Sequence, residues 1–187
     1  MNEEKLDVSR PFRVEREDPA APDIVAAALD IFCRGREHDV VLLCIGTDRT
    51  IADALGPLVG SLVREQCPEL PIIGTLDEPL HAENLKQQVM WSRLHHPGRL
   101  EIAIDASLSR PQEVDWIDIR PEGLIPGRVL AKSLPKVGEI SILAKVGPYP
   151  GRGNGADPLP AARLGPIYQM AKAIARGIEQ WWTERSQ

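Results

Sequence analysis

The spacing of apolar residues changes several times along the chain, and each spacing predicts a different element. In residues 23–34 the side chains of Ile24, Ala28 and Ile31 recur three or four positions apart, which is the pattern of one buried helix face. Residues 39–46 are instead a continuous aliphatic run between a charge and a glycine, which predicts a strand buried on both faces. A helix followed by a buried strand therefore opens the folded part of the chain.

The same alternation continues through the middle of the chain. Helical spacing predicts helices over residues 55–66 and 79–94, the second with Pro79 at a favoured early position. Short aliphatic runs predict strands over residues 71–76 and 100–105. Parallel strands joined by helical crossovers satisfy this order most simply. We therefore expect a three-layer α/β/α fold with a mostly parallel sheet and helices on both faces.

The second half of the chain is less regular. Residues 114–119 alternate with a period of two, as an edge strand does, and residues 138–146 predict a further strand. Residues 147–166 hold five prolines and five glycines without any period, which predicts one long loop. Whether that loop closes over a site as a lid is left open by its composition. A last helix begins at Leu164.

The N-terminal residues differ in composition from the rest. Residues 1–22 carry many charges, few aliphatic side chains and three prolines, which predicts a flexible N-terminal arm. The total of 187 residues is close to the roughly 150 of a typical domain, so residues 23–187 are expected to form a single α/β domain. A domain of this size can fold without disulfides or a structural metal.

Charge and composition exclude several classes of protein. The chain has 22 basic and 27 acidic residues and a net charge of −5, which argues against nucleic-acid binding. No apolar run reaches the ~18 residues of a membrane span, and the polar residues 1–6 form no secretory signal. Cys33, Cys44 and Cys67 match no zinc pattern and predict a reducing, cytoplasmic compartment. Residues 151–155 lack the lysine and hydroxyl of a phosphate loop, and no cofactor is predicted.

Two acidic residues stand where a parallel sheet places its ligands. Asp53 lies where the loop after the first predicted strand meets the next helix, and Asp105 ends the strand 100–105. Ligands bind beyond the carboxyl ends of parallel strands, so both acids share one crevice if these strands are neighbours. Two nearby carboxylates repel, so one keeps its proton and donates it while the other activates water. The structural alternative is that Asp53 caps its helix and Asp105 only terminates a strand.

Further polar residues follow the first and second predicted strands and are expected to bind substrate in the crevice. They are Thr47, Asp48, Arg49, Thr75, Asp77 and His81. Arg49 can clamp a carboxylate. His81, placed in the first turn of the third predicted helix, is a candidate third metal ligand beside the two aspartates. A lone histidine at a helix start is more often simply half-exposed, so no metal is predicted.

Long motifs of the chain resemble those of the YyaC-like sporulation proteins of endospore-forming bacteria. The resemblance is carried by CIGTDRTIADALGPLVG at 44–60, GTLDEPLHAENL at 74–85, AIDASLSR at 103–110, LPKVGEI at 134–140 and the helix around Met170. Together these motifs span nearly the whole predicted domain. The resemblance implies a sporulation protein in the cytoplasm of the forespore or the mother cell.

That family is similar in turn to the spore germination protease and the hydrogenase maturation proteases, which implies a phosphorylase/hydrolase-like α/β fold. The catalytic aspartates of the germination protease match Asp53, within the motif ADALGP, and Asp105, within the motif IDA. The maturation proteases hold nickel with the corresponding acids and a late histidine, whereas residues 161–165 contain no histidine. The chain also departs from its nearer relatives at residues 158–164, where they carry more polar side chains.

Residues and resemblance together predict a sporulation or germination peptidase. Asp53 and Asp105 would activate water on a protein or peptide substrate, and the resemblance implies small acid-soluble spore proteins as substrates. Two alternatives stay open: a non-catalytic spore protein that binds a peptide or small ligand in the same cleft, and a metal-dependent protease of the maturation type. The apolar edge around Trp116 favours a homo-oligomer, and no nucleic-acid or membrane partner is expected.

Overall fold

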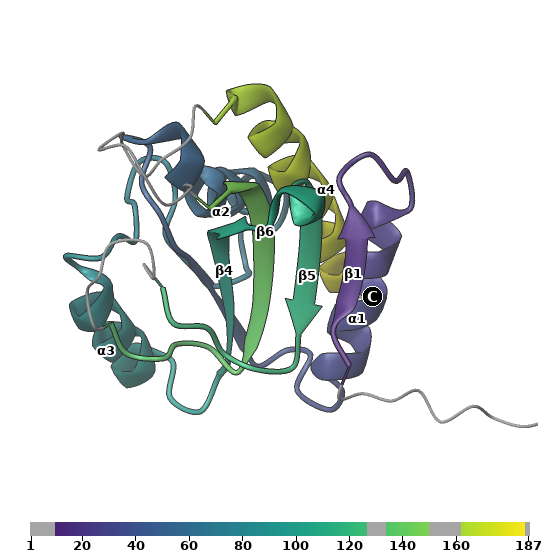
Figure 1. Ribbon diagram of the computed structural model, residues 1–187. Helices are drawn as coiled ribbons and strands as arrows, with labels where there is room; N and C mark the ends of the chain where they lie inside the picture. The colour runs from purple at the N-terminus through teal and green to yellow at the C-terminus, as the bar shows by residue number, and fades with distance from the viewer. Residues whose placement is uncertain (1–9, 127–133, 150–161, 186–187) are drawn as a thin grey trace, which may run out of the picture.

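A computed structural model describes residues 10–126, 134–149 and 162–185 of the protein (Figure 1). Within these ranges six strands form one sheet in the order β1-β5-β6-β4-β2-β3. The strands are β1 (Phe12–Glu15), β2 (Val40–Cys44), β3 (Ile72–Ile73), β4 (Leu100–Ser109), β5 (Trp116–Arg120) and β6 (Ile140–Pro148). The helices are α1 (Ala21–Phe32), α2 (Leu55–Gln66), α3 (Leu85–His95) and α4 (Leu164–Thr183), with short 3-10 turns η1 (Ile51–Asp53) and η2 (Pro111–Glu113).

The sheet is mixed but mostly parallel. Strands β2, β3, β4 and β6 run parallel, whereas β5 runs antiparallel to β6 and β1 runs antiparallel to β5. The predicted α/β class with a mostly parallel sheet is therefore confirmed. Strands β2 and β4 are direct neighbours, with Cys44 beside Ile104. The carboxyl ends of these two strands consequently meet at the same edge of the sheet. The two candidate aspartates were expected to share one crevice if these strands are neighbours, and this condition is met.

Helices α1, α2 and α4 cover one face of the sheet. Alternate residues of the central strands point into this core, and Ile102, Ile104 and Ile142 are fully buried there. The stripe of α4 that packs against them includes Ile174 and Ile178, which are also fully buried. Each such side chain contributes roughly 1.5–3 kcal/mol by leaving water. None of the helices in the described ranges is long and apolar enough to cross a membrane.

The opposite face of the sheet is covered only in part. Helix α3 packs there through Leu85 and Val89 against Val41, Leu43 and Ala103, which belong to β2 and β4. In Figure 1, α3 lies to the side of β4, and the face of β5 and β6 towards the viewer has no helix in front of it. This open part of the sheet is the surface on which a ligand can bind.

The third helix starts later than the sequence predicts. Helix α3 begins at Leu85 and not at Pro79, and His81 lies in the turn before it. The backbone N–H of His81 donates to Oδ1 of Asn84 at 2.8 Å, and Nδ2 of Asn84 donates to the carbonyl oxygen of Pro79 at 3.0 Å. These side-chain hydrogen bonds hold the backbone in a turn and delay the helix. The placement of His81 in the first helical turn is therefore wrong.

The predicted N-terminal arm contains an ordered strand. Residues 12–15 form β1, in which Val14 is buried and Phe12 packs edge to face on Phe32 with ring centres 5.6 Å apart. The prediction that all of residues 1–22 form a flexible arm is wrong for this strand. Strand β5, predicted at an edge, lies between β1 and β6. Strand β1 was missed because its four alternating residues, among charges and prolines, are too short a pattern to indicate a strand.

Parts of two predicted segments fall outside the described residues. They are residues 1–9 of the predicted arm and residues 150–161 of the predicted loop 147–166. The question of a lid therefore lies outside the described structure. Strand β6 runs to Pro148 and so extends into the predicted loop, whereas α4 starts at Leu164, as predicted.

Close backbone contacts hold η1 against the end of β2. A Cβ atom on Gly56, the second residue of α2, would lie 2.0 Å from the carbonyl oxygen of Ile45. A Cβ atom on Gly46 would lie 2.0 Å from the carbonyl oxygen of Asp53, and the φ angle of Gly46 is +142°, a value that favours glycine. The backbone N–H of Thr47 donates to the same oxygen at 3.0 Å. These two glycines allow the packing that fixes the backbone of Asp53.

The substitution Gly56→Ala is expected to lower the free energy of unfolding by roughly 2–4 kcal/mol, because its methyl group has no space beside Ile45. Gly165→Ala is a matched control. Gly165 is likewise the second residue of a helix within a Leu-Gly-Pro sequence, but nothing lies within 4 Å of its Cβ position. The control is expected to change stability by less than about 1 kcal/mol. Urea unfolding of both variants measures the difference, and equal losses would contradict the packing argument.

Candidate active site

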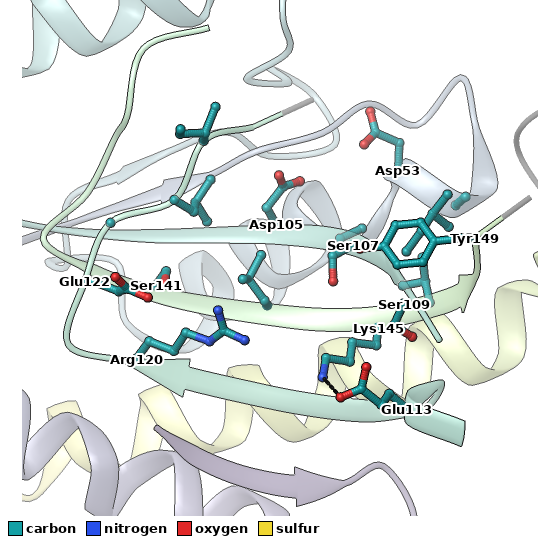
Figure 2. Close-up of a pocket in the computed structure, with 18 of the residues that line it drawn as sticks. Asp53, Asp105, Ser107, Ser109, Glu113, Arg120, Glu122, Ser141, Lys145 and Tyr149 are labelled. Carbon is teal, nitrogen blue, oxygen red and sulfur yellow. Dashed lines mark hydrogen bonds and ion pairs between the residues drawn. The ribbon is translucent and has the colours of Figure 1, made fainter. Parts of the chain in front are cut away.

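A cavity of about 670 Å³ opens on the partly uncovered face of the sheet (Figure 2). Residues of β4, β5 and β6 form its floor, and the loop after β2 together with η1 forms one wall. Its polar lining includes Asp53, Asp105, Ser107, Arg120, Ser141 and Lys145. Both candidate aspartates therefore line the same cavity.

Asp105 lies in the middle of a strand. The prediction that it ends its strand is wrong, because β4 continues to Ser109. Its neighbours Ile104 and Ala106 point towards the helix-covered core, so strand alternation directs Asp105 to the open face. Across the sheet it pairs with Leu143 of β6. Asp105 is only 7% exposed, and its carboxyl group is consequently poorly solvated.

Asp53 reaches the cavity from a turn. It is the last residue of η1, and only Ala54 separates it from the start of α2 at Leu55. It is only half-buried. Its charge raises the pKa of Asp105, so the two carboxyl groups are close enough to interact. Figure 2 shows both carboxyl groups on the same side of the cavity, one from β4 and the other from the wall above it.

The two acids hold their protons with different strength. Burial raises the pKa of Asp53 from 3.8 to about 6, opposed by a hydrogen bond from the Thr47 backbone. Burial, followed by the charge of Asp53, raises the pKa of Asp105 well above its usual value, opposed by a hydrogen bond from the Ala106 backbone. Asp105, which is the more buried and also faces the charge of Asp53, favours its protonated form, whereas Asp53, with a pKa of about 6, is mostly ionised at pH 7. A base and an acid in one cavity are the pair that general acid–base catalysis requires.

The predicted binding residues of the first loop are only partly in the cavity. Thr47 lines it, whereas Asp48 and Arg49 are not among the residues that do. Both are exposed, and the backbone N–H of Arg49 donates to Oγ1 of Thr47 at 3.3 Å. Substrate binding by Asp48 and Arg49 stays a prediction.

The predicted binding residues of the second loop lie in the turn between β3 and α3, outside the cavity lining. Thr75 is buried, and its Oγ1 accepts a hydrogen bond from the Glu78 backbone at 3.2 Å. Nδ1 of His81 accepts from the Glu83 backbone at 3.3 Å, and Asp77 is exposed. The polar atoms of Thr75 and His81 thus stabilise this turn, and a role of the three residues in binding stays a prediction.

The described residues contain no group of three histidine, cysteine, aspartate or glutamate side chains that could hold a metal ion. His81 therefore does not join Asp53 and Asp105 in a three-ligand site. The chemistry that the described geometry offers at the cavity is that of two acids.

Sequence analysis missed the cationic side of the cavity. Arg120 and Lys145 line it together with Ser141. Each of them occupies an alternate position of β5 or β6 whose neighbours point into the core. The available signal was the period of two in these strands, with polar residues recurring on one face. That signal predicts a solvated face of each strand, but it does not predict that β4, β5 and β6 lie side by side and form one cavity.

The substitution Asp105→Asn is expected to stabilise the protein increasingly as pH rises. The folded-state pKa of Asp105 lies above the unfolded value, so the favourable effect of its proton on folding is complete below about pH 4 and is lost as pH rises towards the folded pKa. An asparagine is neutral at every pH, and the difference should grow by ~1 kcal/mol per pH unit between these limits. Urea unfolding at pH 4, 6 and 8 measures it.

Asp23→Asn serves as the control for this titration series. Asp23 is an exposed acid in the first turn of α1, and its replacement should give no comparable rise with pH. A destabilisation by Asp105→Asn that is the same at all three pH values would contradict the assignment of a raised pKa.

Comparisons with known proteins place these residues in a family. A family model described as "Protein of unknown function (DUF1256)" matches residues 13–177, a range that includes both aspartates. A relative from Bacillus subtilis (strain 168), named "Uncharacterized protein YyaC", is 34% identical over 154 residues, which cover 78% of this chain and 73% of the relative. The resemblance to YyaC-like proteins is thereby confirmed. The chain belongs to the DUF1256 family.

Proposed function

We propose that the protein is a peptidase in which Asp53 and Asp105 act as a base and an acid on a bound water and a peptide bond. The observation that carries the proposal is the difference between the two acids in one cavity. Asp53 has a pKa of about 6, while Asp105 has a pKa well above its usual value. Environments that push the pKa values of two carboxyl groups apart are typical of such acid–base pairs.

The reaction would proceed by attack of water on the peptide carbonyl. The Asp53 carboxylate removes a proton as the water oxygen bonds to the carbonyl carbon, and Asp105 donates its proton to the carbonyl oxygen. In the second step the proton held by Asp53 passes to the amine, the C–N bond breaks, and the hydroxyl proton returns to Asp105. Both residues then regain their starting states, so that no metal or cofactor enters the balance.

The resemblance stated from the sequence supplies the biological part of the proposal. The YyaC-like sporulation proteins and the germination protease imply a phosphorylase/hydrolase-like three-layer fold and a role in sporulation or germination. Small acid-soluble spore proteins are then the first substrates to test. The protein would act in the cytoplasm of the forespore or the mother cell.

Cleavage of small acid-soluble spore proteins is expected for the wild-type protein at neutral pH. Asp53→Asn and Asp105→Asn should each lower the rate by at least ~100-fold, since each removes one partner of the proton transfers. Asp23→Asn, on the helix-covered side of the sheet, is the control and should retain the full rate. Gel electrophoresis and mass spectrometry of the fragments measure the outcome.

The non-catalytic alternative gives a different result in the same assay. Intact substrates with wild type and both variants, together with measurable binding of the substrate protein, would replace the peptidase by a peptide-binding protein. Cleavage that persists in both asparagine variants would instead assign the reaction to other residues.

The pH dependence of the rate provides a separate prediction. The rate should rise as pH increases through about 6, because Asp53 must lose its proton to act as a base. It should fall again once the pH is high enough for Asp105 to lose the proton that it donates. Initial rates between pH 4 and 10 test both limbs. A rate that is highest at pH 4 would contradict the assigned roles.

A further inference from the structure

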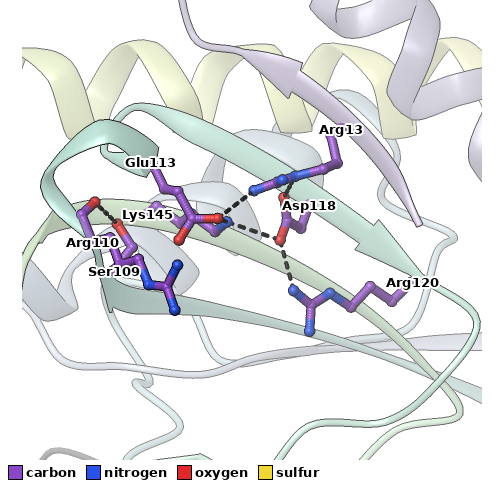
Figure 3. A network of polar contacts seen from close by, with 7 residues as sticks. All are labelled: Arg13, Ser109, Arg110, Glu113, Asp118, Arg120 and Lys145. Atoms are coloured by element: carbon purple, nitrogen blue, oxygen red, sulfur yellow. Dashed lines mark hydrogen bonds and ion pairs between the residues drawn. The ribbon is translucent and has the colours of Figure 1, made fainter. Parts of the chain in front are cut away.

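A cluster of charged side chains lies on the open face of the sheet (Figure 3), and its members Arg120 and Lys145 line the same cavity as Asp53 and Asp105. At its centre Asp118 of β5, whose side chain is 1% exposed, receives three cations. Nε of Arg13 lies 2.8 Å, Nη2 of Arg120 2.7 Å and Nζ of Lys145 3.1 Å from its oxygens. Glu113 contacts Arg13 at 3.0 Å and Lys145 at 3.3 Å. Three strands and η2 thus contribute to one network.

This network carries an excess of positive charge. Burial raises the pKa of Asp118, but hydrogen bonds from Arg120, Arg13 and Lys145 outweigh it and leave the pKa below its usual value. A hydrogen bond from Arg13 likewise lowers the pKa of Glu113. Both acids are therefore ionised at neutral pH, and three cations face two anions. An unbalanced charge in a half-buried site is unfavourable unless a further anion compensates it.

Two buried polar atoms beside the network have no hydrogen-bond partner within the described part of the chain. They are Nε of Arg120 and Oγ of Ser141. Ser141 is 1% exposed, and both residues line the cavity. They are directly paired across β5 and β6, so their side chains stand next to each other on the same face. Buried polar atoms without a partner are costly and require an explanation.

Arg120 has N–H donors that its contact with Asp118 does not use. Only its Nη2 contacts Asp118, while a guanidinium has five N–H donors. Glu122 and Lys136 also line the cavity, both exposed and of opposite charge, and the ionised Asp53 lies on the wall formed by η1, so the positive excess is local to the network. An acceptor with one negative charge and two oxygens fits the free Nε and the Ser141 hydroxyl.

The position of these donors relates them to the acid pair. Ser141 stands beside Ala103, two residues before Asp105 on the neighbouring strand. Strand spacing and rise place the Cα atoms of Ser141 and Asp105 roughly 8 Å apart. Figure 2 shows Arg120 directed into the same cavity below Asp105. A carboxylate held here would lie within one or two residues of a peptide bond held at the acids.

We propose that Arg120 and Ser141 form a carboxylate-binding subsite of the cavity, with the positive excess of the surrounding network adding to the attraction. The carboxylate belongs to the peptide substrate, either as an acidic side chain or as the C-terminal group. The description of the ligand as a substrate rests on the proposed peptidase function, whereas the binding of a carboxylate does not.

The test measures binding of short peptides to the full chain carrying Asp53→Asn, so that turnover does not interfere. Isothermal titration compares an N-acetylated, C-terminally amidated peptide containing one glutamate with the same peptide containing glutamine. The glutamate peptide is expected to bind roughly 10- to 100-fold more tightly, since hydrogen bonds to a charged group are the stronger ones. A third peptide with glutamine and a free C-terminus distinguishes the terminal carboxylate from the side chain.

Two variants in the same background connect this preference to the subsite. With Arg120→Met or Ser141→Ala, the glutamate and glutamine peptides should bind with dissociation constants within about threefold of each other. Ser141→Ala removes only a hydroxyl that has no partner, so its unfolding midpoint should stay the same or rise. It therefore keeps the test valid if Arg120→Met unfolds the network. Arg110→Met removes an exposed arginine outside the cavity lining and should leave the preference unchanged.

The outcomes separate this proposal from the peptidase. Equal binding of all three peptides, or a preference that Ser141→Ala and Arg120→Met leave intact, overturns the subsite. A preference that both variants abolish supports it, even if wild type cleaves no substrate. Cleavage by wild type without any carboxylate preference supports the peptidase and overturns the subsite.

Discussion

The burial of a carboxyl group in the middle of β4 is the constraint on which the candidate site depends. Ile102 and Ile104 must face the helix-covered core, and strand alternation then fixes Asp105 on the opposite face. There Asp105 is 7% exposed, and its partner on the neighbouring strand is Leu143 and not a cation. A charge at this point is poorly solvated, so the acid keeps its proton. The apolar core on one face thus determines the chemistry on the other.

The second acid differs because another kind of element carries it. Asp53 sits on a turn that two glycine contacts hold against the end of β2, and it is less buried than Asp105. Its pKa of about 6 is therefore raised less. Had both acids come from neighbouring strand positions, their environments would be alike and their proton affinities similar. The difference that acid–base chemistry requires follows from a rigid strand beside a tightly packed turn.

The sequence predicts those parts of the fold whose signals are local. The aliphatic run of β2 and the helical spacing of α2 and α4 appear in the structure close to their predicted bounds. Strand β1 and the late start of α3 were missed, since one depends on pairing with β5 and the other on the side chain of Asn84. The two aspartates were selected because strand ends are favoured ligand positions; they line one cavity although Asp105 lies within β4 and not at its end. The cationic cluster could not, because it depends on the register of β1, β5 and β6.

The cavity combines two kinds of charge, and their separation has a chemical consequence. The acids at one end have raised pKa values, whereas hydrogen bonds from three cations hold the pKa of Asp118 below its usual value. The positive excess of the network around Asp118 favours the loss of protons from Asp53 and Asp105. A carboxylate bound at Arg120 and Ser141, with the Cα atom of Ser141 roughly 8 Å from that of Asp105 along the sheet, would offset this positive excess. The loaded cavity would therefore hold the proton on Asp105 more firmly than the empty one, at the moment when that proton is needed.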